Sequence, residues 1–199
     1  MKVGDRVPSI KLTSDAGKPV DLAAAAKSKA VIYFYPKDDT PGCTREAQGF
    51  TAAAKDFAAL GATVFGISKD KVESHCKFRD KYKLTIPLLS DPDLVAHKAF
   101  GAYGEKTMYG KKVTGVIRST FLVENGAVVR AWSSVKVDGH VDAVLAELRG
   151  EGAGGKPKKV EAKKAPASKA TRKTAAPKTT VKKAAAKAAA PAKKKSAKK

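Results

Sequence analysis

Cys43, one of two cysteines in this chain of 199 residues, occupies a position that favours a reactive thiol. An apolar, β-branched run at residues 30–34 precedes it and predicts a buried strand. A stretch rich in Ala, Glu and Lys follows at residues 45–60 and predicts a helix. Unpaired backbone N–H groups and a partial positive charge at a helix N-terminus favour a thiolate over a thiol. We therefore expect a nucleophilic cysteine where the strand ends, a loop turns and the helix begins.

The loop that leads to this cysteine carries a longer pattern, Tyr35-Pro-Lys-Asp-Asp-Thr-Pro-Gly-Cys-Thr44. The spacing Pro36-x-x-x-Thr40-x-x-Cys43, combined with Arg118 in a later predicted strand, resembles that of the peroxiredoxins. Further segments resemble the bacterioferritin-comigratory (PrxQ) subgroup: Gly66-Ile-Ser-Lys-Asp70, Leu88-Leu-Ser-Asp91, Tyr103-Gly-Glu-Lys106 and Arg118-Ser-Thr-Phe-Leu122. The resemblance covers most of residues 1–150 and implies a thioredoxin-like fold. It also implies a thiol-dependent peroxidase that reduces hydrogen peroxide and organic hydroperoxides without a metal, flavin or haem.

Each residue of this set suits peroxide reduction. Cys43 is the expected nucleophile and becomes a sulfenic acid; since a free thiol ionises near pH ~8.5, the helix end and Arg118 must favour the thiolate. The Thr40 hydroxyl can both donate and accept, so it can hold the peroxide and orient the thiolate. Pro36 fixes the loop and helps to exclude water. Arg118 and the backbone N–H of Cys43 can stabilise the charge that develops on the separating oxygens.

Taken one at a time, the same residues have simpler explanations. An isolated cysteine is more often a small buried residue, and Thr40 alone would be a helix N-cap. Pro36 alone would only punctuate a loop, and Arg118 alone would be a surface residue. Their joint occurrence favours the catalytic interpretation over these alternatives.

The sequence leaves two possibilities for the second half of the reaction, in which the oxidised Cys43 is reduced again. Many members of the PrxQ subgroup carry a resolving cysteine five residues after the nucleophile, where this chain has Gln48. Cys76 is the remaining thiol, and some relatives place the resolving cysteine on the corresponding helix. A Cys43–Cys76 bond would require local unwinding, because bridged Cα atoms lie within about 7 Å. The alternative is an inert, half-buried Cys76, with an external thiol such as thioredoxin as the reductant.

Other candidate residues carry weaker signals. His75, His97 and His140 show no ligand spacing, so we expect surface histidines and no metal site. Tyr103, Met108 and Tyr109 are predicted to lie in a loop, which in relatives lies near the active site; they line the peroxide entry or cover the core.

The elements that must position these residues alternate between strands and helices, which predicts the α/β class with a mixed central sheet flanked by helices. Strands are expected at 10–12, 19–20, 30–35, 62–68, 86–90, 115–123 and 128–132. Helices are expected at 44–60, 70–82, 91–100 and 138–149. Asn125-Gly126 predicts a tight hairpin turn, and Gly61 a helix end.

Composition divides the chain into a domain at residues 1–150 and a disordered tail at residues 151–199. The tail holds 17 Lys/Arg against 2 Asp/Glu, a net charge of +15 out of +21, which leaves +6 for residues 1–150. It has no aromatic residue, Leu or Ile, so it cannot form a core. Its Lys/Ala/Pro repeats resemble histone H1 tails. Such a polycation binds phosphate backbones without reading their sequence.

These features set the expected surroundings of the protein. The sequence contains no apolar run of about 18 residues, so we expect no membrane span. Met1 leads directly into polar sequence, so we expect no secretory signal. Two cysteines in this context predict a reducing compartment, so we expect a cytoplasmic monomer associated with the nucleoid or chromatin through its tail. The competing hypothesis is a DNA-binding protein in which residues 1–150 are a catalytically silent scaffold; the complete set around Cys43 argues against it.

Overall fold

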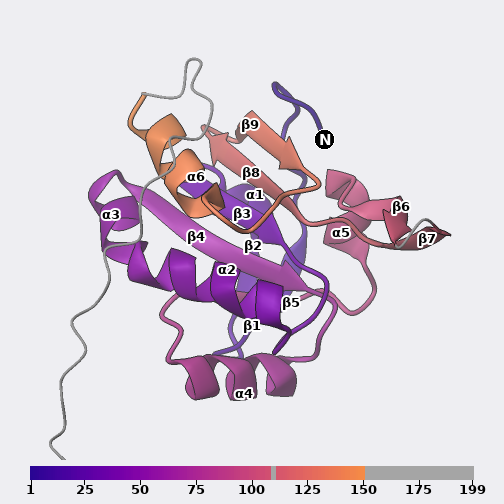
Figure 1. Ribbon diagram of the computed structural model, residues 1–199. Helices are drawn as coiled ribbons and strands as arrows, with labels where there is room; N and C mark the ends of the chain where they lie inside the picture. Colours follow the sequence, from indigo (N-terminus) through magenta and orange to yellow (C-terminus); the bar gives the residue numbers. More distant parts are fainter. Residues whose placement is uncertain (109–110, 151–199) are drawn as a thin grey trace, which may run out of the picture. The chain divides into compact units, whose positions relative to one another are not determined.

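The computed structural model describes residues 1–108 and 111–150, which form a mixed sheet with helices on both faces (Figure 1). The strands are β1 (Lys11–Ser14), β2 (Pro19–Asp21), β3 (Lys29–Phe34), β4 (Ala62–Ser68), β5 (Leu88–Ser90), β6 (Tyr103–Met108), β7 (Lys111–Val116), β8 (Ser119–Glu124) and β9 (Ala127–Ser133). The helices are α1 (Leu22–Ala25), α2 (Pro41–Ala52), α3 (Ala54–Ala59), α4 (Val72–Tyr82), α5 (Val95–Phe100) and α6 (His140–Leu148). The predicted tail lies outside the described residues, so its extent stays a prediction.

Seven strands form the main sheet in the order β2-β1-β5-β4-β3-β8-β9. Strands β3, β4 and β5 run parallel, whereas β1 and β8 pair antiparallel with their neighbours β5 and β3. The predicted α/β class with a mixed central sheet is therefore confirmed, as are the leading β1–β2 hairpin and the Asn125-Gly126 turn. No helix among the described residues is long and apolar enough to cross a membrane.

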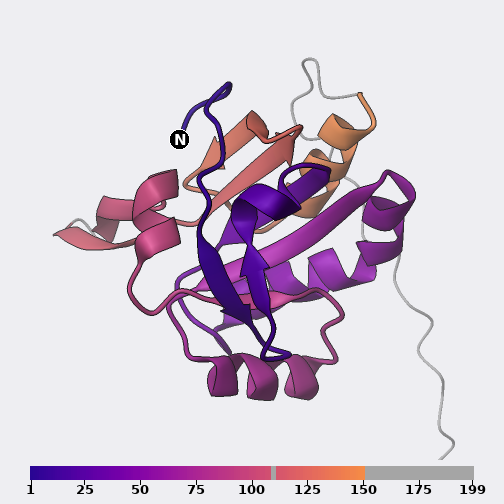
Figure 2. The ribbon, with the colours of Figure 1, turned by 180° about the vertical axis from the view of Figure 1, so that it is seen from behind.

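The central strand β3 is buried on both faces and so divides the core into two layers. Ala30, Ile32 and Phe34 point into the cluster that is covered by α1 and α5. Val31 and Tyr33 point the opposite way, into the cluster that is covered by α2, α4 and α6. Figure 1 shows α2 in front of the sheet with α4 below it, and Figure 2 shows α1 on the reverse side. Because full burial of each large apolar side chain contributes roughly 1.5–3 kcal/mol, β3 is a rigid base for the loop that follows it.

The sheet topology brings three segments that are distant in the sequence together at one end of the central strands. Phe34 at the end of β3 pairs with Ile67 near the end of the parallel strand β4. The same residue pairs with Ser119 at the start of the antiparallel strand β8. The loop after β3, the loop after β4 and the residue that precedes Ser119 therefore meet at this end.

The predicted helix at 44–60 is two helices. It begins three residues earlier, at Pro41, because Thr40 has extended N-cap backbone angles and proline suits the first helical position. The chain leaves regular helical geometry at Ala53, where α2 ends and α3 begins. Gly61 follows α3 with a φ of +73°, which confirms the predicted helix end.

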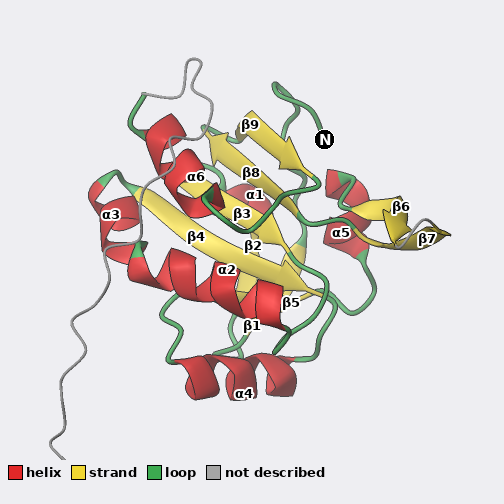
Figure 3. Cartoon of the chain, in the orientation of Figure 1, coloured by secondary structure: helices red, strands yellow, loops and turns green. Residues whose placement is uncertain are grey.

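The prediction of one continuous strand at 115–123 is wrong, because these residues form parts of two strands in two different sheets. Residues up to Val116 pair with β6 in a separate hairpin, and the main-sheet strand starts only at Ser119 (Figure 3). Ile117 lies between them, and its N–H donates to the carbonyl of Ala102. The loop predicted for Tyr103 and Met108 is also wrong, since both lie in β6, while Tyr109 lies outside the described residues.

The prediction of surface histidines is wrong as well. His75 and His97 are fully buried, and His140 is 6% exposed. Each ring has a hydrogen-bonding partner: Asp38 for His75, Asp91 for His97 and Thr120 for His140. Such partners reduce the cost of burying an imidazole. The predicted helix start at residue 91 is wrong, because Leu94 has a left-handed backbone with a φ of +57° and α5 begins only at Val95. There the Asp91 carboxylate accepts from the N–H groups of Val95 and His97.

Candidate active site

Cys43 lies in the first turn of α2, as the strand–loop–helix pattern predicts. Its thiol is buried, with the residue 2% exposed. Thr40 occupies the N-cap position, but its hydroxyl donates to the carbonyl of Lys37 at 3.1 Å and makes no hydrogen bond to the helix. The Thr40 hydroxyl therefore does not cap the first-turn N–H groups, and the partial positive charge of the helix N-terminus lies in the turn that carries Cys43.

Arg118 reaches this sulfur from across the sheet. It lies in the turn before β8, and not within a strand as predicted. Its Nη2 is 3.2 Å from Cys43 Sγ, although 75 residues separate them in the sequence. The guanidinium packs beside the first turn of α2, since a Cβ on Gly42 would lie in ordinary van der Waals contact with it, 3.5 Å from Arg118 Nη2. Burial opposes the charge of Arg118, but Glu46 and Cys43 outweigh it and hold the pKa of Arg118 above its usual value.

The structure therefore brings Cys43 and Arg118 into contact, and it places the other predicted residues around them. Pro36 and Thr40 are half-buried in the loop that joins β3 to α2. Cys76 does not join this set: it lies on α4, and its Sγ donates to the carbonyl of Asp15 in the β1–β2 turn at 3.0 Å. Both cysteines are free.

Glu46 is a site residue that the sequence analysis missed. It lies one helical turn after Cys43, its side chain is fully buried, and it accepts a hydrogen bond from Nη1 of Arg118. Burial raises the pKa of Glu46 to about 7, although the charge of Arg118 acts in the opposite direction. The i, i+3 spacing from Cys43 on a predicted helix was the available signal, since residues so spaced share one face. Arg118 is thus held by Glu46 on one side and presents its other nitrogen to the sulfur.

Replacing Glu46 with Gln is expected to change how stability depends on pH. The raised pKa means that the folded chain keeps a proton, between the ordinary 4.5 and about 7, that the unfolded chain has released. This group therefore stabilises the fold below pH 4.5, and the stabilisation is lost as pH rises through 7. Urea unfolding at about pH 5 and about pH 7.5 should show that the wild type loses about 2 kcal/mol more than the Glu46→Gln variant. Identical pH dependence in the two proteins would contradict this assignment.

His140 lies close to Arg118 but adds no positive charge. Its Nε2 is 2.7 Å from the hydroxyl of Thr120. Burial, followed by the nearby charge of Arg118, lowers the pKa of His140 to about 4. The imidazole is therefore neutral at physiological pH, and Arg118 is the cation that acts on Cys43.

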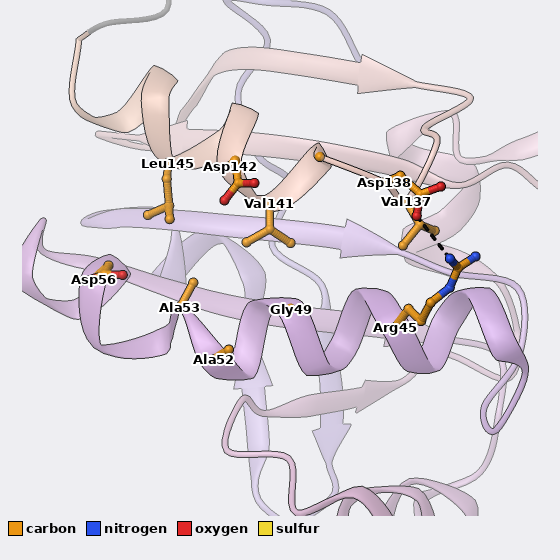
Figure 4. Close-up of a pocket in the computed structure, with 11 residues that line it drawn as sticks. Arg45, Gly49, Ala52, Ala53, Asp56, Val137, Asp138, Val141, Asp142 and Leu145 are labelled. Carbon is orange, nitrogen blue, oxygen red and sulfur yellow. Dashed lines mark hydrogen bonds and ion pairs between the residues drawn. The ribbon is translucent and has the colours of Figure 1, made fainter. Parts of the chain in front are cut away.

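A groove of about 500 Å³ lies between α2 and α6, beside this site (Figure 4). The Arg45–Asp138 ion pair, 3.1 Å long, lies at one end. The helices approach closely along it, because a Cβ on Gly49 would lie 3.1 Å from Val141 Cγ2. The lining includes neither Cys43 nor Arg118, so the reacting sulfur lies outside the groove. Within residues 1–108 and 111–150, no group of three His, Cys, Asp or Glu side chains is placed to hold a metal ion.

Comparison with known proteins identifies what this geometry is similar to. A model described as the AhpC/TSA family matches residues 3–132. Peroxiredoxin Bcp of Xanthomonas campestris is 48% identical over 141 residues, which cover 70% of this chain and 88% of that protein. Peroxiredoxin Bcp of Bacillus subtilis is 39% identical over 150 residues, covering 75% and 96%. A solved structure of the X. campestris bacterioferritin comigratory protein, described in terms of its alkyl peroxide reduction activity, has 45% identity and a TM-score of 0.68, covering 74% and 99%.

Proposed function

This chain belongs to the AhpC/TSA family and is a thiol peroxidase, a peroxiredoxin of the Bcp/PrxQ group with a thioredoxin-like fold, and on that premise we propose that Cys43 attacks the peroxide. The observation that carries this assignment is the buried Cys43 sulfur 3.2 Å from Arg118, in the first turn of a helix. The substrate is a peroxide and the reductant a thiol.

The proposed reaction is the attack of the Cys43 sulfur on the peroxide, assisted by the polar groups around it. The Cys43 thiolate attacks the terminal oxygen of the hydroperoxide, so that an S–O bond forms while the O–O bond breaks. The product is a sulfenic acid on Cys43, and the remaining oxygen leaves as hydroxide or alkoxide and takes a proton from water. Arg118 and the N–H groups of the helix turn stabilise the charge that develops on the oxygens. The Thr40 hydroxyl donates to Lys37 and keeps its lone pairs free to accept from the peroxide.

This assignment is tested by stopped-flow measurement of peroxide consumption. The reduced chain should consume hydrogen peroxide and an organic hydroperoxide in a reaction that is first order in enzyme and in peroxide. A chain that consumes neither peroxide faster than a free thiol would contradict the assignment.

We further propose that an external thiol, with thioredoxin as the family expectation, reduces the Cys43 sulfenic acid. Formation of a Cys43–Cys76 disulfide would require two rearrangements. The first turn of α2 would have to unwind around the buried Cys43, and Cys76 would have to leave its hydrogen bond to Asp15. An incoming thiol requires only the first. The partial exposure of Cys76 and its position on the same face of the sheet as α2 favour the internal route as the second candidate.

The Cys76→Ser variant distinguishes the two routes. If the external route operates, steady-state turnover with thioredoxin should stay within about twofold of the wild type, because Cys76 is then a partly exposed side chain that takes no part in the reaction. Initial oxidation of Cys43 should be unchanged in either case. Normal initial oxidation followed by loss of turnover would instead identify Cys76 as the resolving cysteine.

The basic tail supports a second proposal, which is non-specific binding to nucleic acid. Residues 151–199 carry a net charge of +15 and no aromatic residue, Leu or Ile. Lysines at this density bind phosphate backbones by releasing condensed counterions. The tail would thus keep the peroxidase beside DNA, in a cytoplasmic location at the nucleoid or in chromatin.

Removal of residues 151–199 tests the tail independently of the enzyme. We expect peroxidase rates within about twofold of the full chain, because relatives of about 150 residues carry the whole catalytic domain. DNA affinity at low salt should fall by at least about tenfold, and the steep salt dependence should disappear. Equal DNA affinity of both proteins across a salt titration would contradict the proposal.

A further inference from the structure

The active-site loop is tied to α4 by a buried polar cluster that the reaction itself does not use. Asp38 lies in this loop and is 6% exposed. Its carboxylate accepts hydrogen bonds from the hydroxyls of Tyr35 at 2.8 Å and Ser74 at 2.7 Å, and lies 2.9 Å from Nδ1 of His75. We call these four residues the Asp38 cluster. Tyr35 and Asp38 belong to the loop, whereas Ser74 and His75 belong to α4.

The backbone of Asp38 is held by the same region of the fold. Its N–H donates to a carboxylate oxygen of Asp70, at 2.8 Å, in the turn between β4 and α4. The Ser68 hydroxyl at the end of β4 donates to the same oxygen at 2.9 Å. Main chain and side chain of Asp38 are therefore both fixed to the segment that follows β4.

The ring of His75 finds its hydrogen-bonding partners among the described residues only within the Asp38 cluster. Its Nδ1 lies 3.1 Å from Oδ1 of Asp38, so a hydrogen on Nδ1 is donated to this carboxylate. Its Nε2 is buried and has no hydrogen-bonding partner among the described residues. The ring is fully buried and tilted against Tyr35, with centroids 6.4 Å apart. A buried carboxylate that loses one of its hydrogen-bond donors is no longer compensated for its lost hydration, so the conformation that buries it becomes less stable. The loop therefore depends on His75 to keep Asp38 in its closed position.

The cluster lies between two groups that the reaction needs. Asp38 is two residues after Pro36 and two residues before Thr40, so its position fixes both. The next residue, Asp39, has a φ of +55° and is held to α4 by Lys81, at 2.7 Å, and Tyr82. Because Cys43 is only 2% exposed, a reducing thiol reaches it only after the first turn of α2 unwinds, and this loop must move with that turn because it leads directly into it.

Resting on the peroxidase function above, we propose that the Asp38 cluster positions the loop for attack on peroxide and sets how readily the oxidised Cys43 becomes accessible. In the closed loop, the sulfenic acid reacts with a second peroxide, which transfers one oxygen to sulfur and leaves as water or alcohol, giving a sulfinic acid. In the open loop, an external thiol displaces the hydroxyl of the sulfenic acid, giving a disulfide and water. A weaker cluster therefore slows the first oxidation, speeds access by thiols and lowers sulfinic acid formation.

The His75→Leu variant of the full chain tests this inference. We expect peroxide oxidation of Cys43 to slow by about tenfold and alkylation of Cys43 by a small reagent in the folded protein to speed up by about tenfold, the scale of one lost hydrogen bond to a buried charge. Sulfinic acid per turnover, measured by mass spectrometry, should decrease. The His75→Asn variant restores a donor toward Asp38 and should recover most of both rates.

The chain provides a matched control in its second buried His–Asp pair. His97 is fully buried and its Nδ1 lies 2.6 Å from Asp91, but it lies on α5 and packs against Phe34, on the opposite face of the sheet. His97→Leu should lower stability without changing either rate at Cys43.

The possible results separate this inference from the proposed function. A wild type that does not consume peroxide would overturn the function. A peroxidase-active wild type together with unchanged oxidation and alkylation rates in His75→Leu would overturn the inference. Equal effects of His75→Leu and His97→Leu, or failure of His75→Asn to recover the rates, would show general destabilisation and would also overturn it.

Discussion

The Cys43→Ser variant is expected to lose peroxidase activity by at least about 10³-fold, because removing the nucleophile leaves only the residual contribution of binding and of the surrounding donors. A serine hydroxyl is not deprotonated by a helix end and one arginine to the extent that a thiol is, and oxygen does not accept a second oxygen as sulfur does. Stopped-flow mixing with hydrogen peroxide measures the effect.

Two controls accompany this variant. Cys76→Ser also removes one thiol and should leave the initial peroxide reaction unchanged, so a loss specific to position 43 cannot arise from thiol content alone. Equal peroxide consumption by Cys43→Ser and the wild type would exclude Cys43 as the nucleophile.

The Arg118→Met variant is expected to slow the peroxide reaction by about 10²–10³-fold, the usual effect of removing one donor that stabilises developing negative charge. Arg118→Lys should recover only part of the lost rate, because the donors of lysine share one nitrogen and cannot reach Cys43 and Glu46 together. Rates are measured by stopped flow at pH values on both sides of neutrality.

Loss of Arg118 also leaves the buried Glu46 without its partner, which complicates a simple comparison. Breaking a buried ion pair by removing one member costs about 3–5 kcal/mol of folding free energy. The double variant Arg118→Met/Glu46→Gln should regain stability but not rate. Arg45→Met is the matched surface control, since Arg45 pairs with Asp138 in solvent and should contribute little. A double variant with wild-type rates would exclude a direct role of Arg118.

The strand–loop–helix arrangement around Cys43 was predictable because local signals agree there. An unbroken apolar strand, a proline- and glycine-containing loop and a helical composition follow one another in the sequence, and β3 and α2 occupy these positions in the structure. The contact between Cys43 and Arg118 was predictable only from the resemblance to peroxiredoxins. It depends on the antiparallel pairing of β3 with β8, a long-range feature that no local pattern encodes.

The parts that the sequence did not predict are those that depend on tertiary partners. Glu46 and His75 are polar residues whose burial is made possible by Arg118 and Asp38, which are distant in the sequence. The break between Val116 and Ser119 falls within one continuous, mainly β-branched and apolar run of the sequence, residues 115–123, with no typical turn residue between the two strands. Periodicity therefore predicts that these residues are extended but not which sheet they join.

Mass spectrometry of the reduced chain, treated with one equivalent of hydrogen peroxide in the presence of dimedone, tests the central claim most directly. Dimedone forms a stable adduct with sulfenic acids. The account predicts an adduct on Cys43 and none on Cys76, and its yield should drop sharply in Arg118→Met. An adduct on Cys76 with Cys43 unmodified would contradict the account.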